Sequence, residues 1–416
     1  MRVTVVGAGM VGVSCALALQ QKGLAVTLVD RLPPGSETSH GNAGVLTPSS
    51  LIPFNNPALW QQLPALLRGK NPGFRYKLPY LVGQMAWAAR FLAHSRPPHF
   101  EKTVAALDAL IGLSRGIHHD WLQQAGIRHR MRDDGWIFLY RSEAAWQSGA
   151  WARDVYKKYG VTFETLEFID LQSLEPALQP IFAKGVWFPG AGSVDDPAEV
   201  VRAYARLFAD RGGVWRQSEV MGLRPSSDGG WTVLGATGPL CGGDQVVLAL
   251  GPFSRAFLSQ QGVMKLPMAF ERGTHMHYAP GPVALRRPIY DTAGGYVLSP
   301  MSRGWRLTTG VELNALQAPT PNEPMIQAEK RAREALTMGA ALDTQIWQGS
   351  RPTLPDSRPM IGACPDHPGL WLALGHQHIG FSTGPGTGEL LADLMLGHTP
   401  KLDPVPFSPD RFTFVR

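Results

Sequence analysis

The first thirty residues constrain the fold more than any other part of the chain. The run RVTVV, residues 2–6, is apolar and rich in valine, which is typical of a buried parallel strand. Residues 10–23 have the pattern of a helix that ends at Gly23, and LAVTLVD, residues 24–30, has that of a second strand. Parallel strands need a crossover of this kind to connect them. The sequence therefore predicts a βαβ unit and, with it, an α/β fold.

A glycine pattern, Gly7-x-Gly9-x-x-Gly12, lies between the first strand and the helix. Gly7 allows the tight turn, Gly9 lets the backbone approach a pyrophosphate, and Gly12 lets helix and strand pack closely. Asp30 ends the second strand, where its carboxylate can accept hydrogen bonds from ribose hydroxyls. These features predict a dinucleotide site that includes Gly7, Ala8, Gly9, Met10, Val11, Gly12, Asp30 and Arg31.

The next segment, GSETSHGNAGVLTPSS, spans residues 35–50 and has no aromatic residue. Such small residues let the backbone approach a second part of the ligand. An NAD enzyme has no general need for this segment, whereas FAD is bound extended and its ring must be reached by backbone. We therefore expect FAD rather than NAD, lined by Thr38, Ser39, Asn42, Ala43, Gly44, Val45 and Leu46.

Three phrases resemble the D-amino-acid oxidase superfamily of FAD enzymes. They are ETSHGNAGVLTPS, GSRPTLPDSRPMIG at 349–362 and LWLALGHQHIGFSTGPGTGELLADLMLG at 370–397. Their order is most similar to that in the D-amino-acid dehydrogenases. The resemblance covers both ends of the chain closely and the middle only in pattern. It implies oxidative deamination of a D-amino acid to a 2-oxo acid and ammonia, by hydride transfer from Cα to the flavin N5.

The resemblance also implies an α/β architecture of two interleaved domains. A Rossmann-like FAD-binding domain is expected from 1–50, 196–262 and 352–416, and an antiparallel-sheet substrate domain from 51–195 and 263–351. A last helix is expected over TGELLADLMLG, with its N-terminus facing the flavin pyrimidine edge, where it would stabilise negative charge. Further cofactor contacts are implied at Val220, Gly251, His376, Gly380, Phe381, Ser382 and Thr383. An ordinary core position is the alternative interpretation of Val220.

Arg351 is the candidate anchor for the substrate carboxylate, because a guanidinium grips a carboxylate through two parallel hydrogen bonds. It stands at the position of the motif that has this role in related amine oxidases. Tyr296, in GYVLSP, is expected to supply a second contact through its hydroxyl. Tyr290 and Tyr278 are weaker alternatives for that role, and a core position is the competing interpretation of Tyr296.

Histidines flank the expected flavin position. His378 and His40 are candidates for the catalytic pocket, although hydride transfer from a neutral amine requires no strong base. A structural role in a loop is an equal alternative for each of them. No metal-binding motif is present. The motif block carries Ser350 where some relatives carry a flavin-linked cysteine, so the FAD is expected to be bound non-covalently.

Charge and cysteine content bear on partners. The formal net charge is +6, and residues 38–100 contain six Lys or Arg and no Asp or Glu. Aromatic and aliphatic residues are interleaved with these bases, which favours peripheral contact with an anionic membrane, where a quinone could collect electrons. A solvated basic helix face is the even alternative. Nucleic acid is not expected, since no binding motif accompanies the charge. Three scattered cysteines indicate a cytoplasmic protein. Together with the basic segment, this leads us to expect a peripheral position on the inner face of the cell membrane.

Four functional hypotheses therefore remain. The main one is a D-amino-acid dehydrogenase with an amino-acid substrate and a quinone-type acceptor. The second is a dehydrogenase of D-proline, hydroxyproline or another secondary amino acid, as a subunit of a complex. The third is an oxidase that uses oxygen. The fourth is a non-catalytic FAD-binding subunit or a tRNA-modifying flavoprotein.

Overall fold

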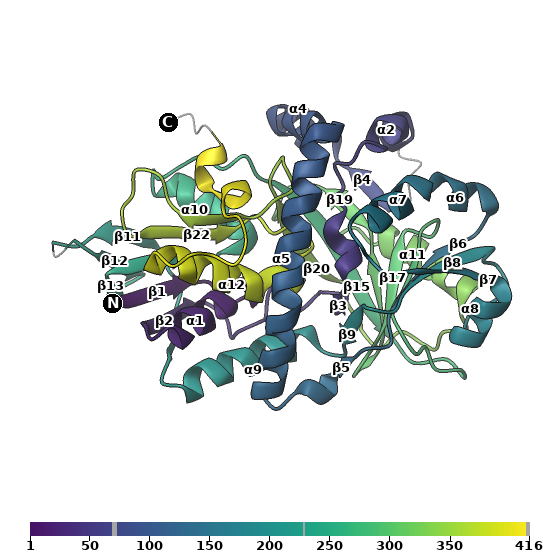
Figure 1. The fold of residues 1–416 in the computed structure, drawn as a ribbon, viewed down its shortest axis with the longest axis horizontal. Helices are drawn as coiled ribbons and strands as arrows, with labels where there is room; N and C mark the ends of the chain where they lie inside the picture. The colour runs from purple at the N-terminus through teal and green to yellow at the C-terminus, as the bar shows by residue number, and fades with distance from the viewer. Residues whose placement is uncertain (69–72, 228, 413–416) are drawn as a thin grey trace.

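The computed structural model describes residues 1–68, 73–227 and 229–412. It contains a mainly parallel sheet and a larger, mainly antiparallel sheet, which lie in opposite halves of the molecule (Figure 1). The parallel sheet confirms the predicted α/β fold class with its Rossmann-like core. Each half has its own buried apolar clusters, as expected when two layers of secondary structure enclose a core.

The parallel sheet has the strand order β10-β2-β1-β14-β22-β21, in which only the β21–β22 pair is antiparallel. The predicted βαβ unit is present as β1, α1 and β2. The bounds are β1 (Arg2–Val6), β2 (Ala25–Asp30), β10 (Val214–Gln217), β14 (Gln245–Leu248), β21 (Met360–Ala363) and β22 (Leu370–Leu374). A three-stranded antiparallel sheet adjoins it, formed by β11 (Gly222–Pro225), β12 (Trp231–Gly235) and β13 (Gly238–Gly243).

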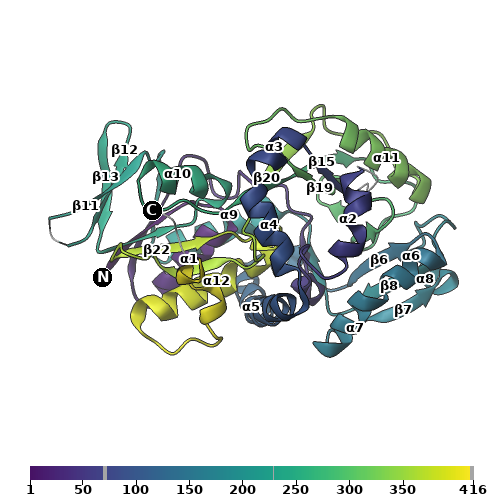
Figure 2. The ribbon, with the colours of Figure 1, turned by 90° about the horizontal axis from the view of Figure 1, so that it is seen from above.

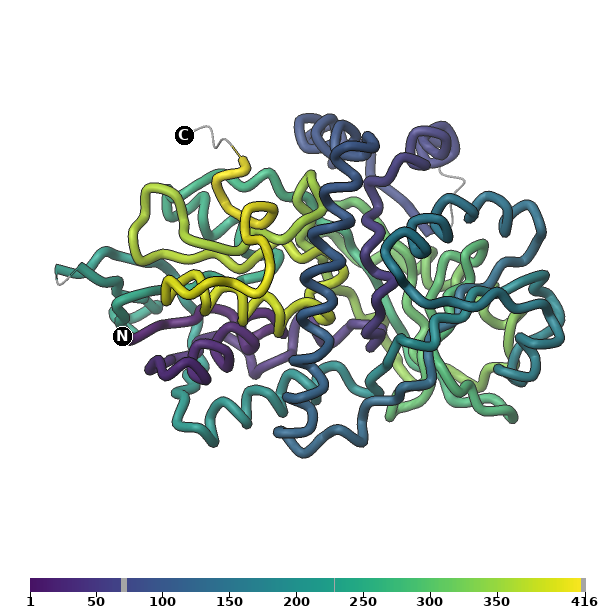
Figure 3. Tube along the Cα trace, in the orientation of Figure 1, coloured from purple at the N-terminus to yellow at the C-terminus, as the bar shows by residue number. Residues whose placement is uncertain are grey.

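Helices α1 (Met10–Gln21), α9 (Pro197–Asp210) and α12 (Gly380–Leu396) pack together beside this sheet. Figure 3 shows that α1 and α12 lie next to each other although they come from opposite ends of the chain. Glycine permits this approach, since a Cβ on Gly388 would lie 2.5 Å from the carbonyl oxygen of Ser14. The N-cap of α9, Asp196, accepts a hydrogen bond from the Glu199 amide at 3.0 Å.

The larger sheet has ten strands. Its path is β4-β19-β15-β18-β17-β16-β6-β8-β7, and β20 pairs with the other edge of β15. The bounds are β4 (Phe74–Tyr76), β6 (Trp136–Tyr140), β7 (Glu164–Glu167), β8 (Lys184–Phe188), β15 (Ala269–Tyr278), β16 (Ile289–Asp291), β17 (Tyr296–Met301), β18 (Gly304–Thr309), β19 (Val311–Leu313) and β20 (Trp347–Thr353). Strands β3 (Val45–Leu46), β9 (Gly192–Val194) and β5 (Met131–Arg132) form a small sheet between the two halves.

Helix α11 (Glu323–Ala335) covers one face of the larger sheet through an apolar cluster shared with β17 and β18. The opposite face of the larger sheet is turned toward the parallel sheet. Other short helices are α6 (Glu143–Ser148), α7 (Ala150–Lys158), α8 (Phe168–Leu174) and α10 (Ser254–Gln260).

Helix α5 (Pro97–Gln124) joins the two halves (Figure 1). Its 28 residues span about 42 Å. Ala106, Leu110 and Trp121 pack into the core cluster of α1 and α12, while Phe100 and Leu107 join a cluster with the substrate-side strand β8. The helix lies within the segment 51–195 that was assigned to a substrate domain, yet much of its apolar face supports the other half.

Helix α12 begins at Gly380, seven residues before the start predicted for the last helix. The predicted helix did not include Pro385, which lies inside α12. Proline cannot donate the hydrogen bond that a helix interior needs. The carbonyl of Phe381, which would have received that bond, instead accepts one from His118 Nε2 of α5 at 2.8 Å. His118 Nδ1 lies 2.9 Å from the Tyr204 hydroxyl, and burial lowers the pKa of His118 to about 4, so the ring is neutral.

Helices α2 (Leu59–Leu67), α3 (Leu78–Gly83) and α4 (Met85–His94) lie on one surface of the molecule (Figure 2). None of the helices in the described ranges is long and apolar enough to cross a membrane.

Candidate functional site

A cavity of about 920 Å³ lies between the two sheets, and both halves of the molecule line it. Its walls include the β1–α1 turn, residues 37–56, the start of α12 and the inner face of the larger sheet. Among the residues that the structure describes, no three His, Cys, Asp or Glu side chains are grouped so that they could hold a metal ion.

The β1–α1 turn has the geometry that a phosphate cradle requires. Gly7 has a φ of +113°, and a Cβ there would lie 2.3 Å from the Ala249 carbonyl oxygen. Gly9 caps α1 without a side-chain hydrogen bond, and a Cβ on it would lie 3.4 Å from Ser39 Oγ. The helix N-terminus therefore faces open space bounded by backbone, where N–H groups can bind an anion. Gly7, Gly9, Met10 and Val11 all line the cavity.

Asp30 fixes this turn from the end of β2. Its carboxylate accepts hydrogen bonds from the Ala8 amide at 2.6 Å and the Leu32 amide at 3.1 Å. Arg31 forms an ion pair with Glu37 at 2.6 Å and lies over the Phe253 ring, 4.3 Å from its centroid. The remaining predicted contacts of this end, Val220 and Gly251, line the same part of the cavity together with Glu219.

The second small-residue segment runs beside the turn. Ser39 Oγ accepts a hydrogen bond from the Met10 amide at 3.0 Å, and Thr38 Oγ1 donates to the Ser350 carbonyl at 3.0 Å. Gly44 has a φ of +76°, and a Cβ there would lie 2.4 Å from the Val194 carbonyl oxygen. This close approach explains why the segment contains small residues. Of the cofactor contacts predicted in this segment, those that line the cavity are Thr38, Ser39, Asn42, Ala43 and Val45.

A buried arginine that the sequence interpretation missed holds this segment in place. Arg306 Nη1 donates to the carbonyls of His40 at 2.8 Å and Asn42 at 2.6 Å, and Arg306 Nε donates to His277 Nε2 at 3.2 Å. His277 Nδ1 in turn lies 2.8 Å from Asp343 Oδ2. Burial lowers the pKa of His277, which keeps Nε2 able to accept. The backbone beside the cavity is thus fixed by three charged or polar side chains from elsewhere.

The start of α12 forms another side of the cavity. Gly380, Phe381 and Ser382 line the cavity, and Ser382 Oγ donates to the Val45 carbonyl at 3.2 Å. His376 also lines it, but its Nε2 lies 2.9 Å from Thr387 Oγ1, and burial lowers its pKa to about 3. A neutral, hydrogen-bonded His376 is a structural side chain at this position.

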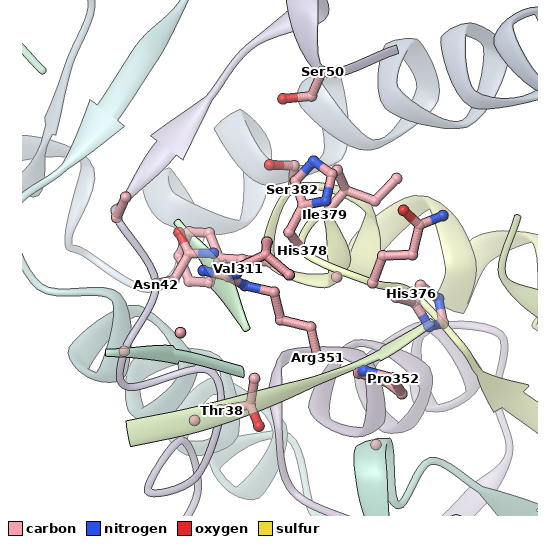
Figure 4. Close-up of a pocket in the computed structure, with 18 of the residues that line it drawn as sticks. Thr38, Asn42, Ser50, Val311, Arg351, Pro352, His376, His378, Ile379 and Ser382 are labelled. Atoms are coloured by element: carbon pink, nitrogen blue, oxygen red, sulfur yellow. The ribbon is translucent and has the colours of Figure 1, made fainter. Parts of the chain in front are cut away.

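Arg351 extends from β20 into the cavity (Figure 4). Its guanidinium makes no hydrogen bond or ion pair with the described part of the chain. Its cross-strand neighbour is Glu271, but the guanidinium passes instead over Gly273, where a Cβ would lie 2.5 Å from Arg351 Nη2. Burial lowers the pKa of Arg351, and Glu271 opposes this shift. An arginine still keeps its charge, so the cavity holds a positive charge with nothing in contact to neutralise it.

Tyr296 and its two alternatives lie on different faces of the larger sheet. Side chains alternate along a strand, and the side chain of Tyr296 belongs to the core cluster that β17 shares with α11. Tyr296 touches the cavity wall but is only 1% exposed. Tyr290, an alternative on β16, pairs with the partly exposed Val297 and with Phe138, and all three line the cavity. Tyr278, the other alternative, donates to Glu329 on α11 at 3.0 Å and lies on the far face.

The two candidate histidines are placed differently. His378 lines the cavity, its ring lies 4.8 Å from the ring of Phe54, and burial and then Arg351 lower its pKa to about 3. His40 does not line the cavity and packs against the rings of Trp347 and His275, each 5.8 Å away. The structure thus brings His378 and Arg351 into one site and leaves His40 behind the wall.

Five of the predicted cofactor residues do not line the cavity. They lie beneath its lining and support it through backbone or core packing. They are Ala8, Gly12, Gly44, Leu46 and Thr383. Gly12 is the most constrained of them, since a Cβ there would lie 1.7 Å from the carbonyl oxygen of Gly7.

These residues fit a dinucleotide that carries a ring system at one end. The cradle at Gly9, the carboxylate of Asp30 and the open start of α12 follow one another along a single cavity. The residues that would hold FAD are those of the β1–α1 turn, the segment 38–46 and the start of α12. The sequence interpretation found them because glycines and short polar residues mark close backbone approach.

The comparisons with known proteins agree with this geometry. Residues 2–394 match the family model described as FAD dependent oxidoreductase. A D-amino-acid oxidase of Bradyrhizobium diazoefficiens is 30% identical over 99% of this chain and 98% of its own length. A D-amino acid dehydrogenase of Methylobacterium is 28% identical over 99% of each.

Two solved structures share the fold. A glycine oxidase from Geobacillus kaustophilus has a TM-score of 0.75 at 21% identity and covers 99% of both chains. An L-proline dehydrogenase from P. horikoshii has a TM-score of 0.75 at 18% identity, covering 99% of this chain and 97% of its own. With a family model matched over nearly the whole chain and a cavity that fits FAD, the chain belongs to the FAD dependent oxidoreductase family.

Proposed function

We propose that this FAD-dependent oxidoreductase acts as a D-amino-acid dehydrogenase. The Cα–H of the substrate leaves as a hydride, a Cα=N bond forms, and water hydrolyses the imino acid to a 2-oxo acid and ammonia. Bound FAD supplies the two-electron acceptor for that hydride. The stereochemical part of the proposal is supported by the full-length similarity to a D-amino-acid oxidase and a D-amino acid dehydrogenase.

The observation that carries the proposal is that the Arg351 guanidinium lies in the cavity without a hydrogen bond or ion pair to the described residues. A half-buried cation without a contacting partner is costly, so such a group is retained where a ligand binds it. A carboxylate held by two N–H groups of the guanidinium has a fixed orientation, which a reaction at the neighbouring Cα needs. Tyr290, whose hydroxyl makes no hydrogen bond with the described residues, is the second group proposed to contact the substrate.

The remaining side chains suit the loss of hydride from a neutral amine. Burial lowers the pKa of His378 to about 3 and raises that of Tyr290 to about 12, so both are neutral at physiological pH. Neither is poised as a strong base, and neither adds a charge that would compete with Arg351. An amine that binds neutral can therefore release its hydride without first transferring a proton to the protein.

A surface near the cavity supports transfer of the electrons to a quinone at a membrane. We define an apolar-basic face by the exposed side chains Trp60, Leu67, Leu78, Val82 and Met85 with Arg68, Lys77 and Arg90. The five apolar residues are between 45% and 63% exposed, and they all lie on α2 to α4, which share one surface (Figure 2). Exposed apolar side chains among bases suit a contact with anionic lipid. Lys70, another base of this segment, lies outside the described residues.

The test is anaerobic reduction of the enzyme-bound flavin by D- and L-amino acids, proline, glycine and amines, followed by reoxidation. We expect bleaching by D-amino acids and faster reoxidation by a quinone analogue than by oxygen. If only proline or only L-amino acids bleach the flavin, the substrate is a secondary amino acid or an L-amino acid, and the D-amino-acid proposal is wrong. Rapid peroxide formation in air would make the enzyme an oxidase.

Arg351→Lys tests the anchor, with Arg90→Lys on the exposed side of α4 as its matched control. A lysine cannot reproduce the two-bond grip, so kcat/KM for an amino acid should fall by about ten- to a hundredfold. Normal turnover by Arg351→Lys would remove Arg351 from the proposed role.

A further inference from the structure

The cavity extends along the larger sheet into a region that the contacts of FAD described above do not use. Its wall there consists of side chains from β6, β16 and α7. We call these residues the aromatic wall: Trp136, Phe138, Tyr140, Trp151, Tyr156 and Tyr290.

Strand register gathers the aromatic wall on one face. Trp136, Phe138 and Tyr140 alternate along β6, so their side chains point to the same side of the sheet. Phe138 is the registered neighbour of Tyr290, and their ring centroids lie 5.2 Å apart. Helix α7 contributes Trp151 and Tyr156 from above the strands.

The aromatic wall is held rigidly from behind. Phe188 on β8 lies 5.1 Å from both the Phe138 ring and the Tyr156 ring, in edge-on arrangements. Edge-to-face packing of this kind fixes ring orientation. The wall is therefore a preformed surface, and filling it with an apolar group removes water from several rings at once.

Charge is distributed unevenly along the cavity. Of the described lining residues, the Asp, Glu, Lys and Arg are Asp30, Arg31, Glu37, Glu219 and Arg351, and the first four lie at the nucleotide end. The substrate end thus combines one cation with an uncharged aromatic surface. A ligand with one carboxylate would pair with the Arg351 guanidinium. A second charge, on the side chain of the ligand, would lose its hydration without gaining an oppositely charged partner.

From this arrangement we infer that the substrate is an amino acid with a large, uncharged aromatic side chain, which packs on the aromatic wall while Arg351 holds its carboxylate. The inference rests on the proposed function and assigns its substrate class. Phe138 is the residue that sets this preference, since it lies at the centre of the wall and touches the cavity directly.

The experiment compares kcat/KM for D-phenylalanine, D-tyrosine and D-tryptophan with that for D-alanine, D-glutamate and D-lysine. Burial of an aromatic ring should favour the first group over D-alanine by about ten- to a hundredfold, and the charged side chains should be the poorest substrates. A preference for D-alanine, or equal use of D-glutamate and D-lysine, would overturn the inference while leaving the proposed function intact. If no amino acid reduces the flavin, the proposed function itself fails.

Phe138→Ala should lower the ratio of efficiencies for D-phenylalanine and D-alanine about tenfold, because D-alanine does not reach the ring that is lost. Phe163→Ala is the matched control, since Phe163 also packs against Phe188, at 6.2 Å, but does not line the cavity. An unchanged ratio in Phe138→Ala, or an equal change in both variants, would contradict the assignment. If Phe138→Ala does not retain FAD, Phe138→Leu makes the same comparison with a smaller loss of volume.

Discussion

The two ends of the cavity are built in different ways. At the nucleotide end, the wall is backbone: Gly7, Gly9 and the start of α1, tied down by Asp30 and Ser39. At the substrate end, the wall consists largely of side chains from several strands and helices, and within the described residues the Arg351 guanidinium and the Tyr290 hydroxyl make no hydrogen bond with the protein. A cofactor that never leaves requires a satisfied, fixed cradle, whereas a substrate that exchanges needs groups left free for it.

The largest expected effect comes from disrupting the backbone wall. Gly12→Val would force the new Cβ to within 1.7 Å of the Gly7 carbonyl oxygen unless the turn moves. We expect loss of FAD and of folded protein, measured as the flavin absorbance per chain and the yield of soluble enzyme. Gly112→Ala is the control, because a Cβ at this helical position in α5 meets nothing within 4 Å and should be neutral or slightly stabilising. Stoichiometric FAD in Gly12→Val would contradict the close packing of turn and helix.

The second prediction concerns the support behind the segment 38–46. Arg306→Met removes the hydrogen bonds to the carbonyls of His40 and Asn42. Charge-assisted bonds are worth about 1.5–3 kcal/mol each, so FAD affinity should fall about ten- to a hundredfold. Arg303→Met is the matched control, since Arg303 is exposed and pairs with Asp343 Oδ1, at 3.1 Å, the oxygen that does not contact His277. Equal FAD dissociation constants in the two variants would show that Arg306 does not fix this segment.

The third prediction uses the buried histidine that supports α12. Burial lowers the pKa of His118 to about 4, below its ordinary value of about 6.5. The unfolded chain therefore binds the proton more readily, and His118 should lower the free energy of unfolding as the pH falls from about 6.5 to about 4. The slope from one such group is at most about 1.4 kcal/mol per pH unit. Unfolding of the enzyme in denaturant at several pH values should show a shallower slope for His118→Gln, and an identical slope would exclude His118 as its source.

The smallest effect on turnover is expected at the surface. Replacing Arg68, Lys77 and Arg90 of the apolar-basic face by glutamine should weaken sedimentation with anionic vesicles several-fold at low salt and leave dye-coupled turnover unchanged. Salt should weaken binding of the original enzyme, because surface charge is screened over about 10 Å at 0.1 M. If neither salt nor the replacements change vesicle binding, the apolar-basic face is an ordinary solvated helix surface and not a membrane contact.

Much of the nucleotide end could be predicted because its signals are local. Glycines at 7, 9 and 12 and an acid at 30 stand in an order that only one turn geometry explains, and the structure has that turn between β1 and α1. The predicted start of α12 was wrong by seven residues, and the reason is a contact between residues distant in the chain. Pro385 ends a helix by local rules, but a hydrogen bond from His118, distant in the chain, replaces the one that proline cannot donate.

The substrate end could be predicted only in part. The motif indicated Arg351, which lines the cavity, but the choice between Tyr296 and Tyr290 depends on which face of β16 and β17 is turned toward the cavity. That choice is made by register with β6 and β18, whose residues lie far away in the sequence.

The sequence by itself determined the βαβ unit and the cofactor class, because each is encoded in neighbouring residues whose geometry is short-range. Tertiary structure alone decided that Phe138, Tyr156 and Tyr290 form one aromatic wall, that Arg306 supports the segment 38–46, and that His40 lies behind the cavity. These features depend on pairing between distant strands, and a strand's sequence does not specify which of its faces a distant partner will cover.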